Sequence, residues 1–156
     1  MKLIKLTQGQ FTQVDDDMFE YLNQWKWYAL KYKDTYYARR DTKNKTKRIV
    51  TRMHRIIMNT PAEMDTDHKD HNGLNNQRNN LRICTSSQNG MNHQFIIGAS
   101  KYIGVTFTRG KYIRADIRVD GKKFHIGSFK TEIEAALAYD KAAIKYHREF
   151  ANLNFK

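Results

Sequence analysis

The residues of this chain that could do chemistry gather in one stretch, where Asp67-His68 is followed by many asparagines, including Asn80 and Asn89. Histidine is well suited to take a proton from water near neutral pH. Carboxylate and amide oxygens suit a hard divalent ion such as Mg²⁺. One ion and one histidine can together activate water, stabilise developing charge and help a leaving oxygen, which are the needs of phosphodiester hydrolysis. Asparagine also tolerates positive φ, so loop structure explains the remaining amides.

The pattern around these residues predicts the order strand, loop, strand, helix. "EMDTDH" is short and extended, the loop turns at Gly73, and "NLRIC" forms the return strand. Residues 85–88, "TSSQ", fit a capping box, so Asn89 is expected near the start of a helix. Successive side chains of a strand point to opposite faces, so Asp67 and His68 can serve an ion and a water from one strand end. This arrangement can bring all four residues to one point.

The type, order and spacing of these residues resemble a known family. Asp67-His68, "NNLR" containing Asn80, and Asn89 resemble the HNH endonucleases, and "MHR" at residues 53–55 makes the chain similar to homing-type enzymes of phages. The resemblance covers residues from about 50 to 93. The chain departs from the usual pattern at His71, where many members carry glycine.

The resemblance implies a ββα-metal fold and a set of roles. Asp67 and Asn89 would bind the divalent ion, with Mg²⁺ preferred and Mn²⁺ as a substitute. His68 would be the general base, Asn80 would orient it, and Arg82 would contact the phosphate backbone. His54 is a further candidate: it either points into the site or packs the strand in which it is expected.

The N-terminal residues 1–58 are predicted to be rich in strands. A short helix is expected at "DMFEYLNQ", with acidic residues near its positive N-terminus. "DTYYARR" and "KRIVTRMHRIIM" are expected to form strands separated by a basic turn. Trp25 and Trp27 are expected to pack the core of this region.

From residue 100 the pattern changes to a three-stranded sheet with one helix. Apolar and polar residues alternate in "KYIRADIRV", which is typical of a half-buried strand, and Asp120-Gly121 favours a hairpin turn. "KYIGVTFT" supplies another strand, with Phe107 among its buried residues. A capping box opens a helix at Thr131. The helix is expected to pack one stripe on the sheet, formed by Ile133, Ala136, Leu137, Ala143 and Ile144.

The outer face of that sheet is basic, as expected of a surface that contacts DNA. Arginine side chains on a convex sheet can enter a major groove and pair with guanine edges. "ADIRVDGKKFHIGSF" and the ending "FANLNF" resemble the Apetala/ethylene-response-factor DNA-binding domain of plants, and the resemblance implies that the sheet lies in the major groove. Tyr112 stands near the place of a usual tryptophan. The predicted DNA contacts here are Arg109, Lys111, Tyr112, Arg114, Arg118, Lys123 and His125.

Composition and charge agree with a nucleic-acid partner. The chain has 156 residues and a net charge of +12, of which residues 1–50 carry +5, residues 51–99 carry +1 and residues 100–156 carry +6. Basic flanks suit phosphate binding through counterion release. The single cysteine, Cys84, excludes an internal disulfide and a zinc site of several thiolates. No apolar run is long enough to span a bilayer, so a cytoplasmic protein is expected, in the bacterial host if a phage encodes it.

Taken together, the sequence predicts an α+β protein with a strand-rich N-terminal segment, a ββα-metal nuclease core and a C-terminal three-stranded antiparallel sheet packed on one helix. The expected divisions are residues 1–97, a linker at 98–101 and a DNA-binding domain at 102–156. The expected activity is metal-dependent cleavage of double-stranded DNA, by a monomer or a dimer formed on DNA, with no small-molecule cofactor. The alternative is a DNA-binding regulator that keeps the nuclease fold but does not cut. RNA suits the sheet less well than duplex DNA.

Overall fold

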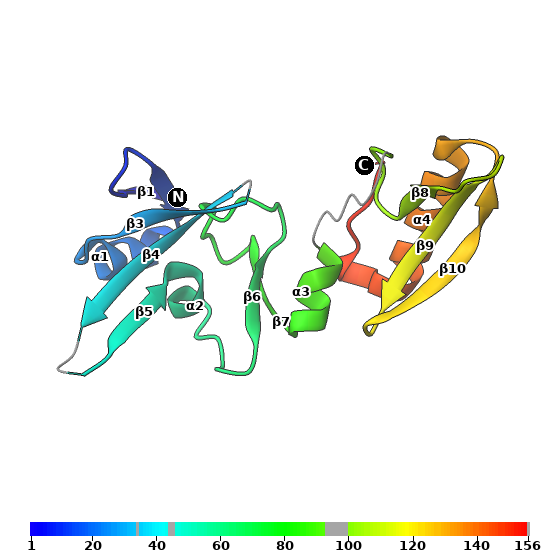
Figure 1. Ribbon diagram of the computed structural model, residues 1–156. Helices are drawn as coiled ribbons and strands as arrows, with labels where there is room; N and C mark the ends of the chain where they lie inside the picture. Colours follow the sequence, from blue (N-terminus) through cyan, green and yellow to red (C-terminus); the bar gives the residue numbers. More distant parts are fainter. Residues whose placement is uncertain (34, 44–45, 93–99, 156) are drawn as a thin grey trace. The chain divides into compact units, whose positions relative to one another are not determined.

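The computed structural model describes residues 1–33, 35–43, 46–92 and 100–155, and the chain divides into two compact units, Met1–Thr85 and Ser86–Lys156. The protein mixes α and β structure, with small antiparallel sheets throughout (Figure 1). The divide lies closer to the N-terminus than the linker expected at 98–101, because helix α3 (Ser86–Asn92) packs on the 3₁₀ helix η1 (Arg148–Phe150). Residues 98 and 99 of that linker lie outside the described residues.

The first unit begins with a hairpin and a helix that cover a three-stranded sheet. Strand β1 (Lys2–Lys5) pairs with β2 (Phe11–Val14), and the turn between them uses positive φ at Gln8 and Gly9. The predicted short helix is confirmed as α1 (Asp16–Asn23). The sheet has the order β3-β4-β5, formed by β3 (Tyr28–Tyr32), β4 (Thr35–Lys43) and β5 (Arg48–Arg52). Trp27, 1% exposed, lies in the core as predicted, and its indole donates to the Leu22 carbonyl at 2.8 Å.

The strand predicted across "KRIVTRMHRIIM" is wrong in its second half. It ends at Arg52, and residues Met53–Ile57 form helix α2. The spacing explains the difference, because Met53 and Ile57 are four residues apart and both face the core, as on one side of a helix. The change of direction carries His54 into the protein interior.

The predicted hairpin of the central region is confirmed. Strand β6 (Asp65–His68) pairs antiparallel with β7 (Leu81–Cys84), so that Asp67 lies opposite Arg82. The connecting loop approaches strand β4 closely at Gly73, where an added Cβ would overlap the Tyr36 carbonyl and lie 2.8 Å from the Tyr37 ring. His71 has a φ of 63°. This left-handed conformation is the physical reason that glycine suits the position.

In the second unit, a sheet with the order β10-β9-β8 packs on helix α4 (Glu132–His147). Its strands are β8 (Val105–Phe107), β9 (Ile113–Val119) and β10 (Lys122–Phe129). The Asp120-Gly121 turn is confirmed, with φ of 49° and 76°. The capping box at the start of α4 is confirmed as well: Glu134 N donates to Thr131 Oγ1 at 3.2 Å, and Thr131 N donates to the Glu134 carboxylate at 3.2 Å.

Helix α4 faces the sheet with a different stripe from the predicted one. Ala136 and Ala143 are buried as expected, but they are joined by Ala135 and Tyr139. The prediction was wrong for the large aliphatic residues, because Ile133, Leu137 and Ile144 are exposed. The predicted burial of Phe107 on β8 was also wrong, because this side chain is exposed. Small side chains let the helix backbone approach the sheet closely, which a face of leucine and isoleucine would prevent.

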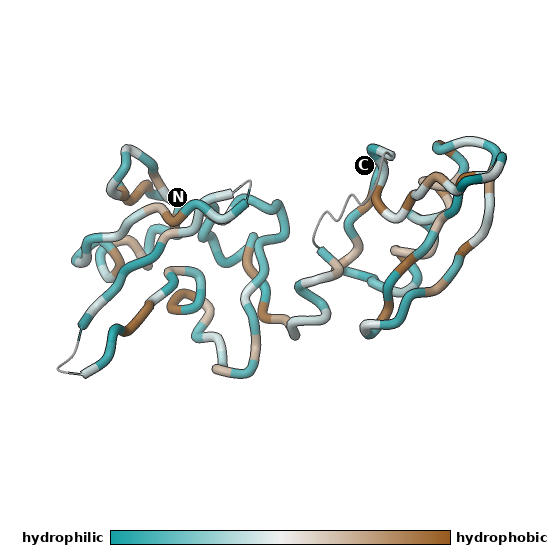
Figure 2. Tube along the Cα trace, viewed as in Figure 1, coloured by the Kyte–Doolittle hydropathy of each residue, from teal (hydrophilic) through white to brown (hydrophobic). Residues whose placement is uncertain are grey.

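Apolar residues are scattered in short segments along the chain. Figure 2 shows each brown segment interrupted by hydrophilic residues. Among the described residues, no helix is long and apolar enough to cross a membrane.

Candidate active site

The hairpin β6–β7 places an ion pair at its centre. Arg82 Nε lies 2.8 Å and its terminal nitrogen Nη2 lies 2.7 Å from the same carboxylate oxygen of Asp67, Oδ2. Both side chains are largely buried, at 12% and 8% exposed. Cross-strand pairing in this register makes the contact, because residues opposite each other on one face lie within reach. The predicted contact of Arg82 with a phosphate stays a prediction.

His68, next to Asp67 at the end of β6, is 4% exposed. Its Nε2 lies 3.1 Å from Oδ1 of Asn76, a fully buried residue in the loop after Gly73. Burial lowers the pKa of His68, and the Asn76 hydrogen bond opposes this effect without overcoming it. The imidazole is therefore neutral at neutral pH and able to accept a proton.

Asn80 forms hydrogen bonds within the loop that connects β6 and β7. Its side-chain nitrogen donates to Asp70 Oδ1 at 2.9 Å and to the Asn75 carbonyl at 2.8 Å, while its oxygen accepts from Asp70 N at 3.2 Å. The amide seen on the His68 ring thus comes from Asn76, which sequence reasoning did not single out. One asparagine among many in a loop gives no local signal of its partner.

Asn89 lies on α3, confirmed as a helix, and therefore belongs to the second unit. Its role as an ion ligand stays a prediction. Within the described part of the chain, no three His, Cys, Asp or Glu side chains form a metal cluster. A site built on one carboxylate, one amide, water and phosphate oxygens does not need such a cluster.

The rings of Tyr37 on strand β4 and His54 on helix α2 pack against the ring of His68. The centroid of the His54 ring lies 5.1 Å from that of His68 with an edge-on orientation, and the Tyr37 centroid lies 5.8 Å from His54 and 5.7 Å from His68. His54 is 5% exposed, and its Nδ1 is buried without a hydrogen-bond partner among the residues that the structure describes. His54 therefore packs in the interior against His68 from a helix and not from the predicted strand, and its role in the site stays a prediction.

The burial of His54 predicts a specific loss of stability in mild acid. Burial, helped by the charges of His68, Arg52 and Arg55, lowers the pKa of His54 from 6.5 to about 3. The unfolded chain then binds the proton more readily than the folded one, so stability falls as the pH drops from 6.5 towards 3. Between pH 7 and pH 5 this one group costs about 2 kcal/mol. Urea unfolding at both pH values should show that His54→Leu loses about that much less than the wild type; equal losses would contradict the assignment.

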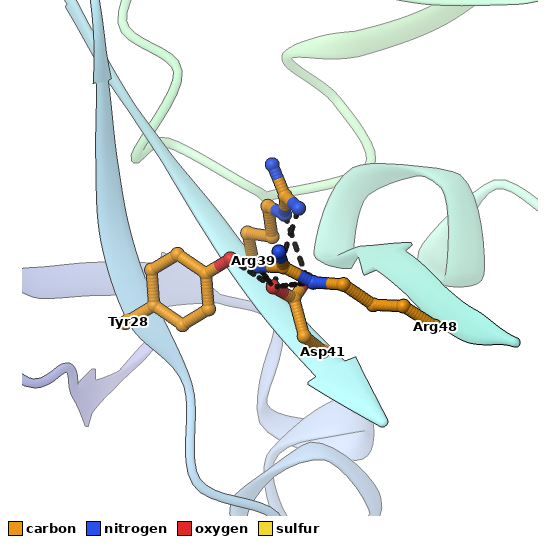
Figure 3. A network of polar contacts seen from close by, with 4 residues as sticks. All are labelled: Tyr28, Arg39, Asp41 and Arg48. Carbon is orange, nitrogen blue, oxygen red and sulfur yellow. Dashed lines mark hydrogen bonds and ion pairs between the residues drawn. The ribbon is translucent and has the colours of Figure 1, made fainter. Parts of the chain in front are cut away.

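The basic strands of the first unit carry a second polar cluster. Figure 3 shows Tyr28, Arg39 and Arg48 converging on Asp41. Arg39 Nε donates to Oδ1 at 2.8 Å, Arg48 Nε and the Tyr28 hydroxyl each donate to Oδ2 at 2.8 Å, and the Arg48 terminal nitrogen also contacts Oδ2. Desolvation raises the pKa of Asp41, but these hydrogen bonds outweigh it and lower the pKa to about 2. Two arginines share one carboxylate, so the cluster keeps a net positive charge.

The outer face of the C-terminal sheet has an acidic residue at its centre. Arg114, Lys123 and His125 all contact Asp116, with Arg114 Nε at 2.7 Å and His125 Nδ1 at 3.1 Å from Oδ1, and Lys123 Nζ at 3.0 Å from Oδ2. Arg118 lies on the same face, opposite Lys123. Burial raises the pKa of Asp116, and the hydrogen bonds from its three basic neighbours overcome that effect and lower it. Asp116 is charged, and sequence reasoning missed its role of holding the basic side chains in place.

The remaining predicted contacts of this face are exposed around the β8–β9 turn. They are Arg109, Lys111 and Tyr112. Their exposure agrees with a contact surface, and their binding role stays a prediction.

Comparison with known proteins supports distant relationships for this chain. Over 153 residues, 94% of its length, it is 29% identical to an uncharacterized HNH endonuclease of Acanthamoeba polyphaga mimivirus, covering 76% of that protein. Over 64 residues, 40% of its length, it is 42% identical to APETALA2-like protein 2 of the indica and japonica subspecies of Oryza sativa, covering 15% of that protein. No family model matches the chain. No solved structure matches it.

Proposed function

We propose that this protein is a metal-dependent DNA endonuclease that hydrolyses phosphodiester bonds at sites selected by its C-terminal sheet. The observation that carries the proposal is a buried histidine, with a pKa lowered by burial, next to a carboxylate on one strand end, in a chain similar over most of its length to an HNH endonuclease. The similarity to a plant protein over part of the chain supports DNA as the substrate. A phage homing-type enzyme acting in a bacterial cytoplasm is the most specific form of the proposal.

In this mechanism His68 is the general base. A neutral imidazole takes a proton from water, whose oxygen attacks the phosphorus while the bond to the leaving oxygen breaks. Asn80 supports the base indirectly, because its three hydrogen bonds fix the loop around Asp70 and Asn75. The interior around His54 and Tyr37 keeps the His68 ring from rotating.

Asp67 and Asn89 are the proposed holders of the divalent ion, Mg²⁺ or Mn²⁺. Their donor set is hard oxygen, which fits these ions. Arg82 contacts one oxygen of Asp67, but a carboxylate offers about four lone-pair positions, so the ion pair and an ion are compatible. A bound divalent ion supplies Lewis-acid stabilisation of the phosphate and the leaving oxygen.

Cleavage of supercoiled plasmid DNA tests the proposal. With Mg²⁺ or Mn²⁺, we expect conversion to nicked or linear DNA that EDTA stops. A monomer would give nicks, whereas a dimer assembled on DNA would give double-strand cuts. Binding without cutting under either metal would support the alternative, a DNA-binding regulator that retains the nuclease shape.

Arg114→Ala should weaken binding to the preferred site and relax the choice of sequence. The expected loss is about 1–3 kcal/mol if the guanidinium pairs with a guanine edge. Lys141→Ala is the matched control, since it removes the same charge from an exposed position of α4, the helix that packs on the sheet's other face. Competition binding with specific and random DNA measures both the affinity for the preferred site and the preference for that site over other sequences. An unchanged site preference in Arg114→Ala would remove this residue from sequence recognition.

A further inference from the structure

Three linked hydrogen bonds run from strand β2 to the candidate base. The Thr12 hydroxyl donates to the Leu74 carbonyl at 2.7 Å, and Asn76 Nδ2 donates to Thr12 Oγ1 at 2.7 Å. Asn76 Oδ1 then lies 3.1 Å from His68 Nε2. Thr12 and Asn76 are both fully buried, so water does not compete for these bonds.

The chain of bonds has only one possible polarity. A backbone carbonyl accepts and never donates, so the Leu74 carbonyl takes the single hydroxyl proton of Thr12. The Thr12 oxygen must then accept from Asn76, which turns the amide nitrogen towards Thr12 and the amide oxygen towards His68. An amide oxygen also only accepts, so His68 Nε2 must carry a proton. The amide orientation therefore follows from its partners.

We propose that Thr12 and Asn76 are positioning residues that hold His68 in the tautomer protonated at Nε2, so that Nδ1 is the nitrogen that takes the proton from water. The inference rests on the proposed function for its catalytic meaning. In the step, an O–H bond of water breaks and an N–H bond forms at Nδ1. The water oxygen bonds to phosphorus, the bond to the leaving oxygen breaks, and that oxygen is protonated from solvent.

In this proposal the β1–β2 hairpin forms part of the candidate site. Strand β2 also binds the loop through its backbone: Gln13 N donates to the Leu74 carbonyl at 2.8 Å, and Asn76 N donates to the Gln13 carbonyl at 2.9 Å. The loop that carries Asn76 is thus fixed by β2 on both sides of Asn75. Residues more than sixty positions before the loop determine how the base is presented.

Nitrogen-15 NMR of the imidazole groups in the full chain tests the inference, because the two ring nitrogens of a neutral histidine have distinct shifts. We expect the wild type to show His68 protonated at Nε2. Thr12→Val keeps the shape but removes the hydroxyl, so the amide loses its fixed polarity, both tautomers appear and cleavage falls roughly tenfold. Thr12→Ser is the matched control and should restore the single tautomer and the cleavage rate.

The wild-type spectrum alone can overturn the inference, even if Thr12→Val fails to fold. A His68 protonated at Nδ1 would do so, and so would a folded Thr12→Val protein with an unchanged tautomer. These outcomes can be told apart from a failure of the proposed function. A protein that cuts DNA while His68 is protonated at Nδ1 would contradict only this inference. A protein whose His68 is protonated at Nε2 but that cuts no DNA would contradict the nuclease function.

Discussion

His68→Ala is expected to abolish detectable plasmid cleavage while DNA affinity stays close to that of the wild type. A general base contributes roughly 10²–10⁴ in rate, and no other histidine lies on strand β6, all of whose residues are described, to replace the lost imidazole. His54 lies behind the ring with an edge-on contact and has a pKa lowered to about 3, and in its buried position it is a packing neighbour of the base. The assay compares initial nicking rates with binding of the same DNA in EDTA.

The control for this variant is His71→Asn, which removes a nearby loop histidine. Asparagine tolerates the positive φ of this position, so the loop should keep its shape and cleavage should persist. His68→Ala also leaves the Asn76 oxygen without its partner and should cost about 1–3 kcal/mol of stability. Circular dichroism must therefore show that the variant is folded. Equal loss of binding and cleavage in a folded protein would contradict the role of His68 as base.

Gly104→Ala is expected to remove much of the stability of the second unit and leave the first intact. Gly104 has a φ of 75°, and a Cβ there would overlap the Tyr139 ring and lie 2.8 Å from the Asp116 carbonyl. The left-handed conformation costs an alanine about 1–2 kcal/mol. The overlap with a buried ring and with backbone adds about 1–3 kcal/mol. The sum, about 2–5 kcal/mol, reaches the lower end of the stability of a unit of this size, roughly 4–10 kcal/mol.

Gly121→Ala provides a matched control, because Gly121 has a φ of 76° but no atom within 4 Å of an added Cβ. Gly121→Ala should lose only the free energy of unfolding that the left-handed conformation costs an alanine, about 1–2 kcal/mol. Both tryptophans lie in the first unit, so tryptophan fluorescence during urea unfolding reports on that unit, and hydrogen exchange of β9 amides reports on the second. Protection of β9 should fall much further in Gly104→Ala than in Gly121→Ala, while the tryptophan transition stays unchanged. Similar protection in the two variants would show that the close approach at Gly104 does not matter.

Local signals predicted much of the fold. The alternation in "KYIRADIRV", the Asp120-Gly121 turn and the Thr131 capping box each act within a few residues, so the sequence alone specifies β9, the hairpin and the start of α4. The face that α4 buries was not predictable in the same way. It depends on how closely the helix approaches the sheet, and the alanines that allow this approach look unremarkable in a hydrophobic pattern.

The candidate site likewise depends partly on local sequence and partly on contacts between residues that are distant in the sequence. Asp67 and His68 were found because their types and spacing are unusual, and pairing in a hairpin determines their strand. Asn76 was missed because its importance comes from Thr12, far away in the sequence, and from burial that no local pattern reveals. Asp116 was missed for a related reason: an acid between two arginines on a strand looks like ordinary charge balance until β10 adds Lys123 and His125.

The buried apolar clusters also bear on how such a protein can change through descent. One cluster draws only on residues of the first unit, and the other two draw only on residues of the second. Among the described residues, these cores have no apolar member in common across the divide. A gene rearrangement that joins either half to a new neighbour therefore leaves that half's interior complete. Exchange of one half would therefore leave the buried apolar core of the retained half undisturbed, but it would separate Asp67 from Asn89, the proposed ion ligands.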